Sequence, residues 1–197
     1  MNMMRFTTMK TKLRKYPSIF LILLLAISSC FLTGCVNQHP KDSKKSSQGE
    51  SVETMLEITD PKEKQAVLNA KAKVKALSGN PRIVATSPAV ADICDKLDLD
   101  LVGVPKSSVS KIPSRYKKVK KVGLAMSPDM EIVSSLNPDW ILAPSSLETD
   151  LKPKFEELKN TEYAFLNLRS VQGMYRSVQE LGEIFGKQQE AEKMTKE

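Results

Sequence analysis

Residues 81–104 read PRIVATSPAVADICDKLDLDLVGV, an order that predicts a strand, a helix and a second strand. The first strand is the β-branched run at 82–86, and the second is the apolar run at 101–104. Between them, Ser87 and Pro88 are residues typical of an N-cap and of the first position of a helix. Because a helical connection returns the chain in its original direction, the two strands are expected to lie parallel in an α/β fold.

The same alternation continues along the chain after a basic loop at 106–121. The sequence contains no repeat of about 20 to 50 residues, so a solenoid is not expected. Residues 80–169 are therefore expected to form one α/β lobe around a parallel sheet. The first predicted helix spans 88–97, and the further predicted elements are two strands, 140–143 and 163–168, and two helices, 129–136 and 151–158.

The first 34 residues predict an export signal. Five basic and no acidic residues accompany an uninterrupted apolar run at 19–27, which is short for a membrane-spanning helix of roughly 20 residues. A spanning anchor is therefore the weaker interpretation. The tetrapeptide Leu32-Thr33-Gly34-Cys35 follows and resembles the lipobox of bacterial lipoproteins. We expect residues 1–34 to be removed and Cys35 to carry the lipid that holds the protein on the extracytoplasmic face of the cell membrane.

Two segments are predicted between the export signal and the lobe. Residues 35–59 contain many polar and few apolar side chains, which predicts a flexible tether. Asp60 and Pro61 then provide an N-cap and a first helical residue, and Gly79 provides a stop signal. The apolar stripe between them is thin, so residues 60–79 are predicted to form a spacer or a lightly docked helix.

The C-terminal residues 170–197 are predicted to form one long helix. Apolar residues recur at helical spacing from Val171 to Phe185, and polar residues continue to the end without a C-cap. A helix of roughly seven turns that stops in this way suggests a truncated chain.

The positive charge of the chain is distributed unevenly. The net charge is +7, of which residues 1–34 carry +5 and residues 35–80 carry +2. Residues 81–197 have 17 basic and 17 acidic side chains, so general nucleic-acid binding is not expected. The basic run 115–121 is interpreted as a solvated loop, with an anionic ligand or a membrane surface as the alternative.

No catalytic residue is predicted. The chain has neither a glycine-rich nucleotide motif nor a nucleophile elbow, so a lipid-anchored enzyme with a nucleotide-binding lobe is only a distant alternative. The single histidine, His39, lies in the predicted tether and is given no role. Cys94 would be the last free thiol of the mature chain, and its apolar surroundings predict a buried filler.

Residues 81–197 contain three notable motifs, which are Ile112-Pro113-Ser114-Arg115-Tyr116, Val122-Gly123-Leu124-Ala125-Met126-Ser127-Pro128 and Leu136-Asn137-Pro138-Asp139 before an apolar strand. These motifs resemble those of the substrate-binding lipoproteins of ABC transporters, in the group that binds iron-siderophores, cobalamin and haem. Their combination is similar to the haem receptor lipoproteins of Gram-positive iron-regulated surface determinant systems. The resemblance implies a two-lobed fold of the periplasmic-binding-protein type, with residues 80–169 as the N-terminal lobe, residues 170–197 as the start of the inter-lobe helix, and the second lobe absent.

The resemblance also implies a ligand and its contacts. Met126 matches a methionine that binds haem iron opposite a histidine of the missing lobe, whereas composition alone favours a core methionine. Haem from donors at the cell surface would be bound and handed to an ABC permease and its ATPase, without catalysis. An iron-siderophore or cobalamin receptor of the same fold is the alternative. The other residues expected to face the haem are Pro88, Ala89, Ser107, Ser108, Val109 and Ser110.

Overall fold

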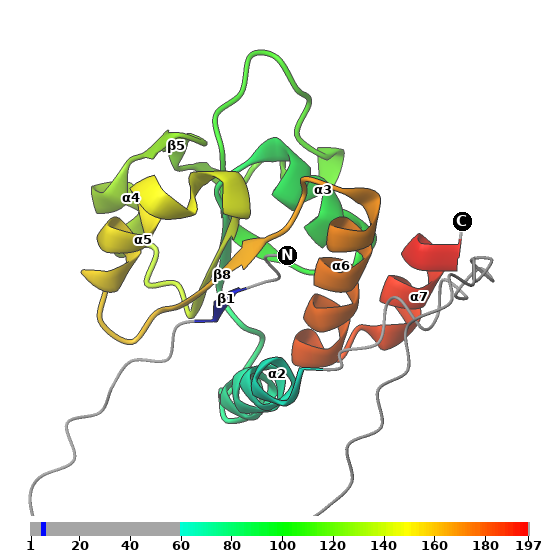
Figure 1. The fold of residues 1–197 in the computed structure, drawn as a ribbon. Coiled ribbons are helices and arrows are strands. Elements are labelled where there is room, and N and C mark those ends of the chain that lie inside the picture. Colours follow the sequence, from blue (N-terminus) through cyan, green and yellow to red (C-terminus); the bar gives the residue numbers. More distant parts are fainter. Residues whose placement is uncertain (1–4, 7–59, 197) are drawn as a thin grey trace, which may run out of the picture. The chain divides into compact units, whose positions relative to one another are not determined.

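A sheet of five parallel strands with one antiparallel edge strand organises the protein, whose computed structural model describes residues 5–6 and 60–196 (Figure 1). The strand order is β1-β8-β7-β2-β3-β4. Strand β2 is therefore central, with β3 and β4 on one side and β7 and β8 on the other. The predicted parallel α/β sheet is therefore confirmed. The strands are β1 (Arg5–Phe6), β2 (Ile83–Ala85), β3 (Leu101–Val104), β4 (Lys120–Lys121), β7 (Trp140–Pro144) and β8 (Glu162–Leu166).

Alternating side chains of the strands supply two hydrophobic cores, one on each face of the sheet. Ile83 and Ala85 of β2 join the core formed with α2, α3, α6 and α7, whereas Val84 joins the core formed with α4 and α5. Both faces are therefore covered, as parallel sheets require. The helices are α2 (Pro61–Lys75), α3 (Pro88–Lys96), α4 (Met130–Ser135), α5 (Glu148–Glu156), α6 (Val171–Phe185) and α7 (Gln188–Lys196).

Side-chain caps place the helix starts close to where the sequence predicted them. The Ser87 hydroxyl accepts from the Val90 amide at 3.3 Å, and Asp129 caps α4 in the same way at 3.0 Å. Each cap satisfies a backbone donor that the first helical turn leaves free. Helix α3 thus begins directly after β2, which fixes the first loop of the sheet.

The predicted loop at 106–121 contains regular structure that the sequence did not indicate. It includes the short 3₁₀ helix η1 (Ser114–Tyr116) and β4, whose two exposed lysines pair with Gly103 and Val104 of β3. Lysines carry no apolar strand signal, so β4 exists because of this pairing. Lysine is also a common residue on exposed sheet edges, where it discourages pairing with other chains.

Arg115 contradicts the interpretation of the whole basic run as solvated. Its guanidinium donates to Asp98 and Asp100 at 2.9 and 2.8 Å and lies over the Tyr116 ring. Tyr116 is buried and donates its hydroxyl to the carbonyl of Leu99. This part of the motif fastens η1 to the connection between α3 and β3. The lysines of the run are exposed, as expected for a solvated loop.

The prediction of one long C-terminal helix was wrong, because the segment is broken into α6 and α7. Gly186 ends α6 in the left-handed conformation, with φ of 71°, and the Lys187 amide donates to the Gly182 carbonyl at 2.7 Å. A glycine directly after the last apolar residue of a helix is a common C-cap, so Gly186 was a local sign of the helix end that the prediction did not use. The chain changes direction there, and a Cβ on Gly182 would meet Ala191 of α7 at 2.7 Å.

Helix α2 is docked on the lobe and does not stand apart as a spacer. The side chain of Asp60 caps it, as predicted, but it ends at Lys75 with Ala76 as its C-cap, so Gly79 is not the stop signal. It packs chiefly on α6. Its buried residues are Glu63, Val67 and Ala70.

The N-terminal predictions fall mostly on residues that the structure does not describe. The lipobox, Cys35, His39 and the tether at 35–59 all lie outside the described residues. Strand β1 is the described part of the predicted export signal, and it pairs antiparallel with β8. Within residues 5–6 and 60–196, no helix combines the length and apolar character needed to cross a membrane.

Candidate ligand-binding site

The parallel strands bring all the predicted contact residues to one edge of the sheet. We call this the carboxyl edge, defined by the loops that follow β2, β3, β7 and β8 and by the hairpin of β5 (Gly123–Leu124) and β6 (Ser127–Pro128). In Figure 1 the loop after β3 projects from this edge, and α2 lies at the opposite one. The strand order reverses between β2 and β7, and ligands of open α/β sheets collect at such switch points.

Met126 lies at the tip of this hairpin. Gly123 pairs with Pro128 and Leu124 pairs with Ser127, which leaves Ala125 and Met126 as a two-residue turn. The Met126 side chain is 72% exposed. A methionine that fills a core would be buried, so the structure excludes the interpretation of Met126 as a core residue. Its thioether is exposed to solvent at the carboxyl edge.

Backbone contacts hold the hairpin in place. The Lys106 amide donates to the Gly123 carbonyl at 2.6 Å, and the Asp129 amide donates to the Val122 carbonyl at 2.7 Å. Gly123 has a φ of 96°, and a Cβ there would lie 2.9 Å from the Asp129 nitrogen. Only glycine fits this position without strain. The turn that carries Met126 is thereby tied to both the loop after β3 and the start of α4.

Exposed apolar side chains gather on the carboxyl edge. Among the described residues, five large apolar side chains are exposed, and only Leu68 on α2 lies elsewhere. Leu124 is 59% exposed and Leu68 is 50% exposed. An apolar rim of this kind is typical of a surface that contacts a ligand or a partner. The four residues of the rim are Val109, Leu124, Met126 and Val171.

Helices α3 and α6 begin at this edge and point their first backbone amides toward it. Pro88 of α3 is half-buried and Ala89 is exposed, with Ser87 as the cap. Ser170 caps α6 by accepting from the Gly173 amide at 3.1 Å. Helix N-termini favour anionic groups, so both could face a carboxylate of a ligand.

The predicted loop 107–110 lies at the same edge. The Ser110 amide donates to the Ser107 hydroxyl at 3.0 Å, and this bond folds the loop back on itself. Ser107 is half-buried, whereas Ser108, Val109 and Ser110 are exposed. Their exposed side chains are therefore available for contact.

Two cations on this edge were not predicted. Lys106 follows β3 and Arg169 follows β8, and both are exposed. Neither takes part in an ion pair within the described parts of the chain. A basic residue directly after a predicted strand was the signal that could have identified them.

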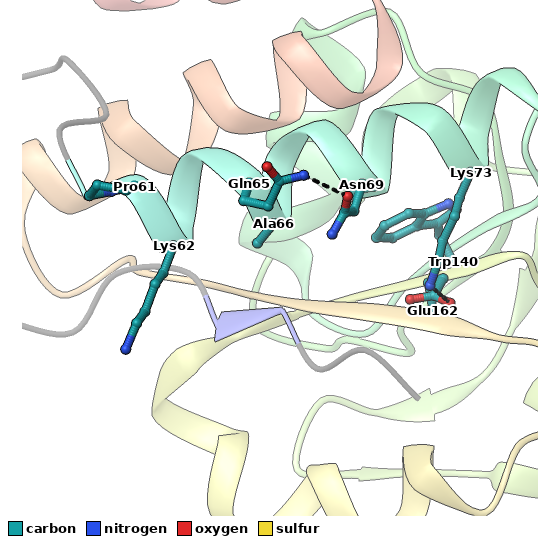
Figure 2. A pocket seen from close by; sticks show the side chains of 9 residues that line it. Pro61, Lys62, Gln65, Ala66, Asn69, Lys73, Trp140 and Glu162 are labelled. Carbon is teal, nitrogen blue, oxygen red and sulfur yellow. Dashed lines mark hydrogen bonds and ion pairs between the residues drawn. The ribbon is translucent and has the colours of Figure 1, made fainter. Parts of the chain in front are cut away.

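Two hollows lie at the opposite, amino edge of the sheet. One of about 450 Å³ lies between α2 and the first residues of β7 and β8, Trp140 and Glu162, where Lys73 pairs with Glu162 (Figure 2). Another of about 520 Å³ is lined by Asn137 and Thr161 among others. Neither contains a predicted ligand residue, and the switch-point rule favours the carboxyl edge.

Two other features could carry chemistry, namely the free thiol of Cys94 and clusters of metal-binding side chains. Cys94 is fully buried, and burial raises the pKa of its thiol to about 12, which supports its predicted role as a filler. No cluster of three or more His, Cys, Asp or Glu side chains able to hold a metal ion occurs in the described chain.

Comparison with known proteins identifies the family of the chain. The sequence pattern of the periplasmic binding protein family matches residues 83–197, more than half of the chain. The chain belongs to the periplasmic binding protein family. Over 117 residues, it is 36% identical to the high-affinity heme uptake system protein IsdE of Staphylococcus aureus, a match that covers 59% of this chain. Because it covers 39% of that protein, the chain spans about two fifths of the length of the curated relatives it matches.

Solved structures of periplasmic binding proteins give the same picture. An ABC transporter substrate-binding protein from Listeria monocytogenes EGD-e is 45% identical with a TM-score of 0.57, and the match covers 60% of this chain and 45% of that one. S. aureus IsdE complexed with heme is 35% identical with a TM-score of 0.56 and the same coverage. The petrobactin-binding protein YclQ from Bacillus subtilis is 25% identical with a TM-score of 0.51, covering 58% and 42%.

These relatives confirm the predicted family and the predicted fold, an α/β lobe of two-lobed proteins. They are substrate-binding proteins and not enzymes, as the sequence indicated. The matched region begins at β2, so α2 and everything before it lie outside the part shared with the family.

Proposed function

We propose that the chain is the N-terminal lobe of a substrate-binding protein of an ABC importer, and that its carboxyl edge binds haem. The observation that carries this proposal is the exposed thioether of Met126, held at a hairpin tip within an apolar rim. A thioether is a soft, neutral ligand that suits haem iron. The flat apolar face of a porphyrin matches a rim of aliphatic side chains.

The rest of the edge fits the polar groups of the same ligand. Haem carries two propionates, which the α3 N-terminus at Pro88 and Ala89 or the exposed cations Lys106 and Arg169 could receive. The loop 107–110 would contact the porphyrin with its exposed side chains. These residues support the proposal because cations, helix N-termini and apolar side chains share the carboxyl edge.

A second axial ligand is expected from another part of the protein. The chain contains one histidine, His39, and it lies outside the described residues. A methionine on one lobe and a histidine on the other would clamp the iron between them. The 197-residue chain alone is therefore expected to bind haem weakly, because half of the pocket would be open to water.

The cellular setting follows from the same proposal. Acylation at Cys35 would hold the protein on the outer face of the cell membrane, with residues 35–59 as a tether. Haem would arrive from donors at the cell surface and leave to an ABC permease powered by its ATPase. The inter-lobe helix would then begin at α7, beyond the break at Gly186.

A siderophore receptor is the second candidate, with cobalamin as a further ligand of the same fold. The two exposed cations of the carboxyl edge favour it, because ferric siderophores are often anionic. The likeness to the petrobactin-binding protein YclQ also supports this candidate. The exposed thioether has no evident role with such a ligand, which is why haem is preferred.

Titration of the two-lobed, full-length parent with haemin tests the proposal. Leu124→Asp places a charge against the porphyrin and should weaken haem binding by more than about tenfold. Leu68→Asp is the matched control, because Leu68 has a similar exposure but lies on α2. The control should keep the Soret shift of the unchanged protein. No Soret shift with haemin, together with saturable binding of a ferric siderophore or cobalamin, would replace haem by that ligand.

A further inference from the structure

A group of charged side chains is buried between α2 and α6, away from the proposed ligand site. We call it the α2–α6 cluster, and it consists of Glu63, Arg176 and Glu180. Glu180 is 0% exposed. The carboxylate of Glu63 and the guanidinium of Arg176 form an ion pair at 3.4 Å, and both side chains are almost fully buried. Sequence alone gives these residues no such role, since charged residues on a helix are normally solvated.

The cluster contains two acids and one base. If both carboxyl groups are ionised, the buried site carries a net negative charge, which is costly in surroundings that exclude water. Neither oxygen of Glu180 receives a hydrogen bond from a donor in the described structure. The ionised form of Glu180 thus lacks the partners that buried charges require. If Glu180 is protonated, it can donate to Glu63 and the cluster becomes neutral.

The acidity of Glu180 follows from this arrangement. Burial, followed by the negative charge of Glu63 and the hydrogen bond between the two carboxyls, raises the pKa of Glu180 to about 9, while Arg176 acts in the opposite direction. At neutral pH the group retains its proton. The proton is held only while α2 covers Glu180, because a solvated glutamate would titrate near its ordinary value of 4.5.

The other contacts of α2 are modest. Its buried apolar residues are Val67 and Ala70, both small. Lys71 pairs with Glu183 of α6, and Lys73 pairs with Glu162 of β8, but these pairs are partly exposed and contribute little. The docking of α2 is therefore weak enough for one proton to matter.

Two helices of the described chain, α2 and α6, supply the charged groups that shift the pKa of Glu180. The charged residues that face Glu180 are Glu63 from α2 and Arg176 from α6 itself. Glu162, from β8, is engaged with Lys73. Lys187, at the joint before α7, is paired with Asp98.

We propose that α2 is a proton-controlled arm, docked on α6 while Glu180 is protonated and released as that proton is lost. A group whose pKa is raised in the docked state stabilises docking at low pH. That contribution is complete below about pH 4.5 and is lost progressively toward about pH 9. Across this window the docking equilibrium constant falls about tenfold for each pH unit.

Release of α2 would change how far the lobe reaches. The helix has 15 residues, which corresponds to about 22 Å of helix. It directly follows the predicted tether at 35–59, so its release would lengthen the connection to the predicted lipid at Cys35. Docking itself depends on neither the anchor nor the ligand.

Hydrogen exchange of the full 197-residue chain, at several pH values between about 6 and 8, tests the arm. Amide protection in α2, corrected for the intrinsic exchange rate, should fall about tenfold per pH unit. Protection in β7 should not follow it. Glu180→Gln imitates the protonated acid and should abolish the pH dependence in α2. Glu157→Gln is the matched control on an exposed glutamate and should behave like the unchanged chain.

Two results would refute the proposal that the proton on Glu180 controls the docking of α2. One is α2 protection that does not change with pH in the unchanged chain, and the other is an equal pH dependence in Glu180→Gln. If circular dichroism shows that Glu180→Gln does not fold, Glu63→Gln takes its place. That variant removes the neighbouring negative charge, so the pH dependence should shrink, and an undiminished slope would reject the proposal.

Discussion

Replacing Met126 with alanine distinguishes a ligand from a packing residue. Full burial of a methionine side chain contributes about 1.5–3 kcal/mol, and Met126 is 72% exposed. The substitution should therefore lower the unfolding free energy of the ligand-free protein by less than about 1 kcal/mol, a shift in Tm below about 4 °C. Leu142→Ala is the control, because Leu142 is fully buried in β7 and its truncation should cost about 2–5 kcal/mol.

The haem spectrum supplies the second half of this prediction. In the two-lobed parent, Met126→Ala should remove one axial ligand, so the absorbance should move away from that of six-coordinate Met/His haem. Folded Leu142→Ala should keep the spectrum of the unchanged protein. The reasoning fails if Met126→Ala destabilises the ligand-free protein by more than about 2 kcal/mol, or if its haem spectrum is unchanged.

Three further outcomes follow from particular residues. Gly186→Ala should lower the unfolding free energy by about 1 kcal/mol in chemical denaturation because of its positive φ, while Gly79→Ala, which has open space around it, should not. The hydrogen bond from Lys187 is the main cause that lowers the pKa of Asp98 below its ordinary value of 3.8. The ionised carboxylate therefore stabilises the fold above about pH 3.8, and this stabilisation is lost as the pH falls below that value. Asp98→Asn should flatten that part of an acid titration of stability, and an unchanged acid limb would reject the assignment. Cys35→Ala should block incorporation of labelled palmitate, and normal labelling would refute the predicted lipobox.

Local signals were sufficient for the centre of the lobe. The strand at 101–104 was predicted with its observed bounds, and Ser87 and Pro88 predicted the start of α3. Both signals act within a few residues of where they stand in the chain. Strand β4 was missed because its two lysines become a strand only through β3, a contact between distant segments. The break at Gly186 was missed although its signal is local, because apolar spacing continued up to it.

The sequence led to the residues proposed for the candidate site but not to their geometry. The motif located Met126, yet a methionine looks the same in sequence whether it fills a core or occupies a turn. Its exposure depends on the pairing of Gly123 with Pro128, which the sequence did not indicate. Glu180 shows the opposite case. Its burial depends on the packing of α2 against α6, two segments that lie far apart in the sequence.

The hairpin that carries Met126 separates the identity of the side chain at its tip from the stability of the lobe. Its strands are joined by backbone bonds, and its anchors at Gly123 and Asp129 do not involve the side chain at position 126. A histidine or tyrosine could occupy that turn without disturbing either core. Under the proposed function, selection could therefore alter which iron compound is captured by changing a single codon, while the sheet beneath it stays the same.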